Sequence, residues 1–366
     1  TLGAQHVGKG RFGHSAILPD GKAPAIRSRP PPVRGAAGCK ADYDGGCFVM
    51  TLARMPDILT LTMNPALDIS TAIDRVEPVH KLRCGPHQTH PGGGGINVAR
   101  VLHRLGSRVR AIYTAGGPLG RELSALLDAE GVPSQVVPIA GGTRESFSVF
   151  ERCSGQDFRF VLPGPTLTEP EWTACLDAVV AGLAQARYVV VSGGLPPGVP
   201  ADFYARLAQR VRAVGRWLVL DASGAALAET LAAGVYLVKP SLRELRELTG
   251  QPLSDEASWR DAARALIAKG QAQIVALSLG ENGALLVTAD QAWRAQSLKV
   301  SVASTIGAGD SFVGGLVWAL SEGQALDEAF RYAMAAGAAA LLSPGTKLCD
   351  PADVERMYRE VVVTAA

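Results

Sequence analysis

Short apolar runs alternate with helical patterns along most of the chain, from Asp57 onward. The runs predict strands at 58–62, 110–113, 188–192, 217–221, 236–239, 274–278 and 284–287. Amphipathic spacing predicts helices at 96–105, 121–130, 169–185, 201–214, 258–269 and 326–342. Such alternation over short connectors is typical of a mostly parallel sheet with helices on both faces. We therefore expect an α/β fold that binds its ligands at the carboxyl ends of the strands.

Two stretches, 69–90 and 144–162, interrupt this alternation. Ser146-Phe-Ser-Val-Phe150 and Phe158-Arg-Phe-Val161 alternate polar and apolar residues, with turn residues between them, as strands with one exposed face do. They do not fit easily into the parallel sheet, so we expect both stretches to form a small β lid. No internal repeat or interdomain linker occurs, and residues 56–366 are therefore predicted to be one domain that carries this lid.

Residues 1–55 differ from the rest of the chain. They are rich in Gly, Pro and Arg, include Arg29-Pro-Pro-Pro-Val33, and lack both strand and helix periodicity and the apolar core of a secretory signal peptide. Met50 and Met55 stand just before the first predicted strand. We expect a disordered extension, or one that is not native, without a role in activity.

Charge and cysteine usage exclude several classes of partner. Lys plus Arg number 36 and Asp plus Glu 34, without a basic block, so no nucleic acid is expected to bind. No apolar run approaches the ~20 residues of a membrane helix, so no membrane partner is expected. The six cysteines form no Cys-x-x-Cys pair, which indicates a reducing compartment, the cytoplasm. His87 and His90 lack a third ligand nearby, which disfavours a metal site there.

The segment Thr305-Ile-Gly-Ala-Gly-Asp-Ser-Phe-Val-Gly-Gly315 carries the strongest functional pattern. It follows a strand-like stretch at 293–302 and enters a predicted helix. The glycine turn leaves the amides of Gly307, Ala308 and Gly309 free at a helix N-terminus, where they attract phosphate oxygens. Asp310 beside them suits a base that takes a proton from an attacking alcohol, although Asp is also an ordinary helix-capping residue. At a helix N-terminus we expect Asp310 to be fully ionised near neutral pH.

A second glycine cluster, Gly92-Gly-Gly-Gly95, precedes a predicted helix that begins with Ile96 and Asn97. Four consecutive glycines are entropically costly, so they predict a close approach of the main chain to a ligand or partner. Asn97 offers a donor and an acceptor to a sugar hydroxyl. A dinucleotide-binding turn is the alternative, but it would follow the first strand directly, whereas lid-like sequence intervenes here.

Together these segments resemble the ribokinase-like, or PfkB, carbohydrate kinases. The resemblance begins near Ile58 and includes 62–68, 81–84, 92–99, 191–198, 238–245, 278–283 and 304–311. It implies a three-layer α/β/α sandwich with a β lid. Asn64-Pro-Ala-Leu-Asp68 narrows it to the phosphosugar kinases, and the glycine cluster with Lys81-Leu-Arg-Cys84 resembles the minor-type 6-phosphofructokinases most closely. The other phosphosugar kinases typically place a lysine at the position of Gly93.

The resemblance assigns the sugar-binding residues. Asp68 and Asn97 would bind sugar hydroxyls, together with the glycine turn at Gly93 and Gly94. Positive charge for the sugar's own phosphate would come from Lys81, Arg83 and Arg144, of which an arginine can bind bidentately. Without the resemblance these three are solvated surface charges, and Asp68 is a turn residue.

The resemblance also assigns a nucleotide site to the C-terminal half, at Lys239, Ser241, Glu244, Ser278, Gly280 and Gly283. Glu244 would hold Mg²⁺ through water, with ATP as the nucleotide. Two positions depart from the family pattern: Ser241 replaces an asparagine, and Gly194 stands where close relatives often carry a serine. Backbone carbonyls near Thr305 and in the loop that ends at Lys347 would offer a site for K⁺.

The predicted activity is the transfer of phosphate from ATP to the C1 hydroxyl of fructose 6-phosphate, with Asp310 as the base. The alternatives are a 1-phosphofructokinase or tagatose-6-phosphate kinase, and, more distantly, a non-catalytic sugar-phosphate sensor or a dehydrogenase. Exposed strand edges on the lid would be a liability in a monomer, so a homodimer paired through the lids is expected.

Overall fold

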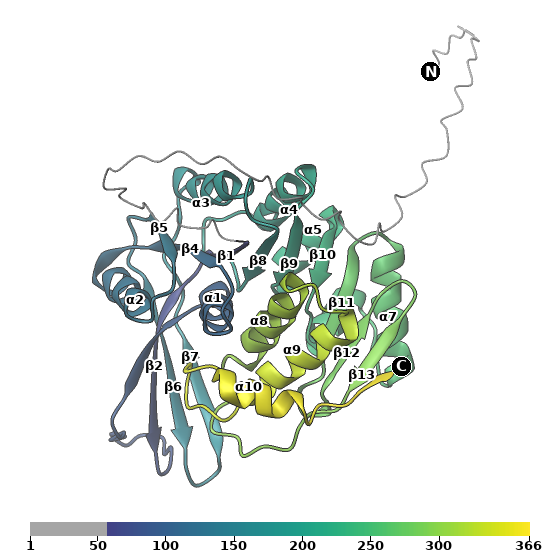
Figure 1. The fold of residues 1–366 in the computed structure, drawn as a ribbon. Coiled ribbons are helices and arrows are strands. Elements are labelled where there is room, and N and C mark those ends of the chain that lie inside the picture. Colours follow the sequence, from purple (N-terminus) through teal and green to yellow (C-terminus); the bar gives the residue numbers. More distant parts are fainter. Residues whose placement is uncertain (1–56) are drawn as a thin grey trace, which may run out of the picture. The chain divides into compact units, whose positions relative to one another are not determined.

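The structure is a computed structural model that describes residues 57–366. Within these residues a ten-stranded sheet has the order β14-β13-β12-β11-β10-β9-β8-β1-β4-β5 (Figure 1). Pairing is parallel from β5 to β11 and antiparallel from β11 to β14. The strands are β1 Ile58–Thr62, β4 Val109–Ala115, β5 Ser134–Pro138, β8 Tyr188–Ser192, β9 Trp217–Asp221, β10 Val235–Val238, β11 Ala272–Ser278, β12 Ala284–Val287, β13 Ala292–Ala295 and β14 Val363–Ala365.

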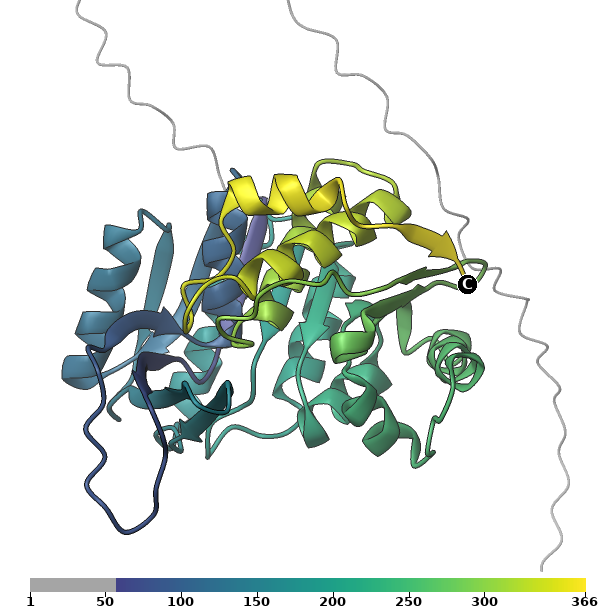
Figure 2. The same cartoon turned by 90° about the horizontal axis from the view of Figure 1, so that it is seen from below.

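The central strands are apolar on both faces because helices cover both. In β8 all five residues are buried: Tyr188 and Val190 join one core cluster, and Val189 and Val191 join the other. The first cluster packs against α1 Gly94–Arg104, α2 Gly117–Ala129, α8 Ala308–Ser321, α9 Leu326–Ala340 and α10 Pro351–Tyr358. The second packs against α3 Glu169–Gly182, α4 Phe203–Ala213, α5 Gly224–Ala233, α6 Leu242–Thr249 and α7 Glu256–Ala268. Figure 2 shows the two helix layers on opposite sides of the sheet.

A second sheet comes from the two stretches that interrupt the alternation. It has four strands in the order β3-β2-β6-β7, with bounds β2 Ala66–Ile73, β3 Gln88–Gly92, β6 Arg144–Glu151 and β7 Gln156–Val161. We call it the lid sheet. In Figure 1 it extends below the β5 side of the large sheet. Asp68 on β2 is level with His90 on β3 and Ser146 on β6, so residues far apart in the sequence meet on one surface.

All the strands predicted for the large sheet form, and so do the predicted helices, with shifted ends. The strand-like stretch at 293–302 is a correction, because only its beginning, in β13, is a strand. Ala295 pairs with Ala284, the first residue of β12, so the residues after it have no strand to pair with. Sequence reasoning missed β5, β14, α5, α6 and α10.

Among the described residues, no helix has the length and apolar character needed to span a bilayer. The predicted N-terminal extension, residues 1–55, lies outside the described residues.

Candidate active site

The N-terminus of α8 is shaped by two glycines. Gly307 caps the helix with φ 77° and ψ 0°, a left-handed conformation that suits glycine, and a Cβ there would overlap the Leu348 side chain. Gly309 is exposed in the first turn, and a Cβ at its position would lie 3.8 Å from Lys239 Nζ. The free amides of this turn and the lysine therefore form a positively polarised surface beside Asp310.

Asp310 is held by two donors from other parts of the chain. Asn97 Nδ2 on α1 donates to Asp310 Oδ2 at 2.9 Å, and the hydroxyl of Ser192, at the end of β8, donates to Oδ1 at 3.3 Å. Burial and the nearby Asp221 raise the pKa of Asp310 to about 6, against the opposing effects of Asn97, Lys239 and Ser192. We expected full ionisation near neutral pH; with this pKa a small fraction of Asp310 is protonated there, and Asp310 is a stronger base than its place at a helix N-terminus suggests.

An ion pair lies behind Asp310. Lys239 Nζ, just after β10, is 3.1 Å from Asp221 Oδ1 at the end of β9, and both side chains are largely buried. Burial alone would lower the pKa of Lys239, but Asp221 outweighs it and the pKa rises, so the lysine stays charged. Sequence reasoning missed Asp221 and Ser192, although both end predicted strands at the edge where ligands gather.

The glycine cluster approaches other parts of the same chain. A Cβ on Gly92 would overlap the Asp68 carboxylate, and one on Gly94 would overlap the Ser192 hydroxyl. Gly93 has φ +112° and lies against Thr62. The predicted close approach is therefore present, and its effect is to bring Asp68, Ser192 and the start of α1 together.

Asp68 lies among cations on the lid sheet. Burial raises the pKa of its carboxyl to about 6, although Thr346, Arg159, Arg144 and Arg100 all lower it. Arg144, at the start of β6, donates to Asn64 Oδ1 at 3.0 Å and to the Asn64 carbonyl at 3.1 Å, which fixes its guanidinium close to Asp68. Arg159 is exposed on β7. Sequence reasoning missed it as a cation near Asp68, although its alternation with Phe158 and Phe160 places its side chain on the other face of the strand from theirs.

The structure does not bring the two other predicted phosphate-binding cations to Asp68. Lys81 and Arg83 are exposed in the loop between β2 and β3, and neither forms an ion pair or side-chain hydrogen bond with another described residue. Figure 2 shows this loop projecting away from both sheets. Any contact with a sugar phosphate would require the loop to move or a second subunit to approach.

Residues predicted to bind the nucleotide lie along neighbouring strand ends. Ser278 ends β11 and pairs with Ser241 through an isolated bridge. Ser241 and Glu244 form the capping box of α6: the Ser241 amide donates to Glu244 Oε2 at 2.8 Å, and the Glu244 amide donates to Ser241 Oγ at 3.2 Å. Glu244 is still close enough to raise the pKa of Lys239.

The two glycines assigned to the nucleotide site are turn residues. Gly280 begins a short 3₁₀ helix with φ +60°, and Gly283 follows this helix with φ +84°. A Cβ on Gly283 would overlap the Ala295 carbonyl. Gly194, one of the two departures from the family pattern, faces open space, since a Cβ there would meet nothing within 4 Å.

The fold and the surroundings of Asp310 define a kinase that transfers phosphate to an alcohol. The sequence model of the pfkB family carbohydrate kinases matches residues 61–353, and the chain belongs to this family. It is 49% identical over 303 residues to the ATP-dependent 6-phosphofructokinase isozyme 2 of Mycobacterium tuberculosis, covering 83% of this chain and 89% of the relative. The isozyme 2 of Escherichia coli is 39% identical over 305 residues, covering 83% and 98%. A 1-phosphofructokinase of Xanthomonas campestris is 35% identical over 312 residues, covering 84% and 98%.

Solved structures agree with these relatives. Phosphofructokinase-2 of Escherichia coli in complex with fructose-6-phosphate matches with a TM-score of 0.79 at 38% identity, covering 84% of this chain and 99% of that one. Its complex with potassium gives the same TM-score and coverage at 39% identity, and its tetrameric inhibited form gives 0.78 at 38%, again covering 84% and 99%. Ribokinase of Arabidopsis thaliana, at 20% identity, shares the fold with a TM-score of 0.67, covering 83% and 99%. The ribokinase-like architecture predicted from the sequence is confirmed.

Proposed function

We propose that this chain transfers the γ-phosphate of ATP to the C1 hydroxyl of fructose 6-phosphate, giving fructose 1,6-bisphosphate. The observation that carries the proposal is Asp310 at the N-terminus of α8, with free amides and Lys239 on one side and Asn97 on the other. Relatives named ATP-dependent 6-phosphofructokinase at 49% and 39% identity support the substrate pair.

The sugar binds between the glycine cluster and the lid sheet. Asp68 accepts hydrogen bonds from its hydroxyls, and Asn97 can donate to them or accept from them. The turn at Gly93 and Gly94 lets the sugar approach the backbone. Arg144 binds the 6-phosphate, with Arg159 as the second cation close to Asp68. Lys81 and Arg83 join them when the β2–β3 loop folds over the sugar or when a partner lid brings its own loop.

The phosphoryl transfer uses Asp310 as the proton acceptor. The C1 oxygen attacks the γ-phosphorus, the bond between that phosphorus and the β,γ-bridging oxygen breaks, and ADP leaves. The hydroxyl proton passes to the Asp310 carboxylate, which is ionised in most molecules at pH 7 with a pKa of about 6. The amides of Gly307, Ala308 and Gly309, with Lys239, stabilise the charge on the transferring group.

ATP lies over the C-terminal strand ends, against Ser241, Ser278, Gly280 and Gly283. Among the described residues no three His, Cys, Asp or Glu side chains gather into a metal cage. That suits Mg²⁺, which commonly binds through one or two carboxylates, water and substrate phosphates. Glu244 is placed for a water-mediated contact because Oε1 is left free by the capping box. Mg²⁺ bound with ATP neutralises phosphate charge and orients the γ-phosphate.

A K⁺ ion binds next to the anion-binding turn. The Leu341 carbonyl accepts from the amide of Ala303 at 2.7 Å, which joins the segment before α8 to the loop after α9. Carbonyls from these two segments supply the oxygen ligands. The potassium complex of the Escherichia coli relative supports this assignment.

Two chains pair through their lid sheets. The edge strand β7 and the residue after it expose Phe160, Val161 and Leu162, with exposed fractions of 53%, 61% and 49%. Exposed apolar side chains on a free strand edge favour pairing with a second copy. The tetrameric form of the Escherichia coli relative shows that assemblies of that protein can be larger than a dimer. Free thiols at Cys84 and Cys153 suit the cytoplasm.

The second candidate substrate is fructose 1-phosphate, which the 35% identical relative's name supports. Gly93, where the 1-phosphofructokinases typically carry a lysine, favours fructose 6-phosphate. The test is kcat/KM for fructose 6-phosphate, fructose 1-phosphate and tagatose 6-phosphate with ATP. A higher kcat/KM for either of the other two sugars overturns the substrate assignment. Failure to transfer isotope from the γ-position to any of them overturns the kinase and favours a sensor.

A further inference from the structure

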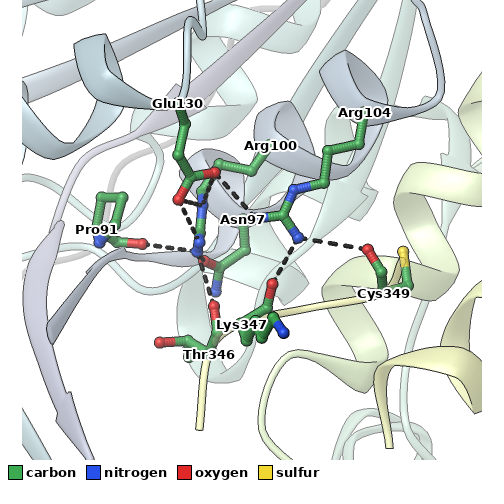
Figure 3. A network of polar contacts seen from close by, with 8 residues as sticks. All are labelled: Pro91, Asn97, Arg100, Arg104, Glu130, Thr346, Lys347 and Cys349. Carbon is green, nitrogen blue, oxygen red and sulfur yellow. Dashed lines mark hydrogen bonds and ion pairs between the residues drawn. The ribbon is translucent and has the colours of Figure 1, made fainter. Parts of the chain in front are cut away.

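Arg100 has a fully buried side chain that contacts three separate segments of the chain. Its guanidinium pairs with Glu130, with Nε at 2.9 Å from Oε2 and Nη2 at 2.6 Å from Oε1 (Figure 3). Nη1 donates to the Pro91 carbonyl at 3.1 Å and to the Thr346 carbonyl at 2.8 Å. One turn further along α1, Arg104 donates to Glu130 at 3.0 Å and to the Cys349 carbonyl at 3.3 Å.

This buried ion-pair network is expected to stabilise the fold less than well-packed apolar side chains of the same volume would. A buried guanidinium loses its hydration, and the attraction of its partner often does no more than offset this loss. What the fork of Arg100 supplies is geometry, because it joins α1, the C-terminal end of α2, the end of β3 and the loop after α9 at fixed distances. Two of these connections lead to the proposed active site.

The first connection leads through Asn97 to Asp310. Arg100 Nη1 lies 3.5 Å from Asn97 Oδ1, while Asn97 Nδ2 donates to Asp310 Oδ2 at 2.9 Å. An amide has a donor end and an acceptor end, and it can turn over. The reversed orientation would set its NH₂ group against the guanidinium and its oxygen against the carboxylate. The positive charge of Arg100 beside Oδ1 therefore favours the orientation in which the donor end of the amide faces the base.

The second connection leads through the loop after α9. The Thr346 carbonyl is bound by Arg100, and the Thr346 side chain lies close enough to Asp68 to lower its pKa, although its hydroxyl has no well-aligned hydrogen bond. Two residues later, Leu348 covers Gly307, the capping residue of α8. The same loop therefore contacts both the sugar-binding acid and the turn that binds the transferring phosphate.

We propose that Arg100, held by Glu130, is a positioning residue for phosphoryl transfer: it orients the Asn97 amide toward Asp310 and fixes Thr346 beside Asp68. It touches neither substrate. The inference rests on the proposed function, since the geometry that it describes matters only if Asp310 is the base. It predicts that the chemical step, and not only the stability of the fold, depends on a buried side chain behind the active site.

Other charged groups also surround these residues. Asp221 and Lys239 face Asp310 from β9 and from the end of β10. Asp68, His90, Arg104 and Glu130 face Arg100. Loss of the Asn97 hydrogen bond alone would raise the pKa of Asp310, because that bond stabilises the ionised form. The acid limb of kcat should then move to higher pH.

The test compares Arg100→Lys, Arg100→Met and Glu130→Gln in the full chain. Arg216→Lys is the matched control, because Arg216 also binds carbonyls of a neighbouring segment, those of Leu183 and Ala184, but it does so near the amino ends of β8 and β9, whereas Asp310 lies near their carboxyl ends. With saturating ATP we expect kcat to fall about tenfold or more in Arg100→Met and by a smaller factor in Arg100→Lys. In both variants the acid limb of kcat should move to higher pH. Arg216→Lys should keep the wild-type kcat and pH profile. Thermal unfolding separates activity loss from unfolded protein.

A double-mutant cycle with Asn97→Ala tests whether Arg100 affects kcat through Asn97. If Arg100 acts through Asn97, Arg100→Lys costs little further kcat once Asn97 is removed. Losses that multiply, or an unshifted acid limb in every folded variant, overturn the proposal, and Glu130→Gln decides if neither Arg100 variant folds. The kcat ratios of variant to wild type are measured with the phosphosugar that the wild type phosphorylates with the highest kcat/KM. Failure of the fructose 6-phosphate assignment is therefore seen in the wild type, and failure of the positioning role is seen in the variants.

Discussion

Lys239 and Asp221 form a buried ion pair, with Nζ 3.1 Å from Oδ1, directly behind the proposed base. Each partner ends or follows a neighbouring strand of the parallel sheet, so the pair exists only when β9 and β10 are in register. The lysine therefore has two roles: it neutralises Asp221, and it faces the turn where the γ-phosphate is expected.

Replacing Lys239 by Met leaves the buried Asp221 without its cationic partner. Breaking a buried pair on one side costs about 3–5 kcal/mol, so we expect a loss of unfolding free energy of that size in urea titrations at pH 8. The double variant Lys239→Met with Asp221→Asn should recover part of the loss, since no charge is then stranded. A loss within the range of surface ion pairs, below about 1 kcal/mol, would show that the pair is solvated.

Asp310→Asn removes the base and keeps the shape of the site. The amide oxygen can still accept from Asn97, and the amide NH₂ then faces the Ser192 hydroxyl, which can turn to accept from it, so sugar binding should change little. Turnover should fall by about 10²-fold or more, because no group is left to take the hydroxyl proton. Steady-state kcat and calorimetric binding of fructose 6-phosphate measure the two effects separately. Near wild-type turnover in this variant would remove Asp310 from the mechanism.

The pH dependence of turnover should report the same carboxylate. Asp310 must be ionised to accept a proton, and burial and Asp221 raise its pKa to about 6. We expect kcat at saturating substrates to be constant above pH 7 and to fall tenfold per unit below pH 6. The measurement uses kcat because a phosphomonoester titrates near pH 6 and affects kcat/KM. A midpoint near pH 4 would mean that the site is more solvated than its geometry indicates.

Asp68→Asn should weaken the binding of fructose 6-phosphate and raise the stability of the fold at pH 8. Burial raises the pKa of Asp68 from 3.8 to about 6, so folding takes up a proton between these pH values. The contribution of this group to the unfolding free energy is complete below about pH 4 and is lost as the pH rises through 6. The variant should therefore melt higher than the wild type at pH 8 but not at pH 4, while its KM for fructose 6-phosphate rises. An equal shift in melting temperature at both pH values would contradict this account.

The sequence predicted Asp310 and its glycine turn because the whole pattern is local, within one turn of α8. It also predicted Asn97, from its place at the start of the helix after the glycine cluster, Asp68, through the resemblance, and the strands that end at Ser192 and Asp221. It did not predict that these strand ends meet Asp310, because that contact depends on the register of several strands and on the packing of α1. Arg100 illustrates the same limit, since nothing in the sequence around it shows that its partners lie on α2 and after α9.

The glycine cluster offers a matched pair of variants. A Cβ on Gly94 would overlap Ser192 Oγ and lie 2.9 Å from the Ser192 backbone carbonyl carbon, where β8 cannot yield. Gly94→Ala should therefore lose about 1–3 kcal/mol of unfolding free energy and displace the Ser192 contact to Asp310, which lowers kcat. Gly194→Ser is the control, because a Cβ at this position meets nothing within 4 Å.

We expect Gly194→Ser to keep the wild-type stability within about 0.5 kcal/mol. The new side chain starts in open space near the beginning of the loop that follows Ser192, where close relatives often carry a serine. KM for fructose 6-phosphate should fall if that space faces the sugar. Equal stability in the two variants would show that β8 and the glycine cluster are not in contact. A lower KM in Gly194→Ser with unchanged kcat would place the sugar between position 194 and Asp310.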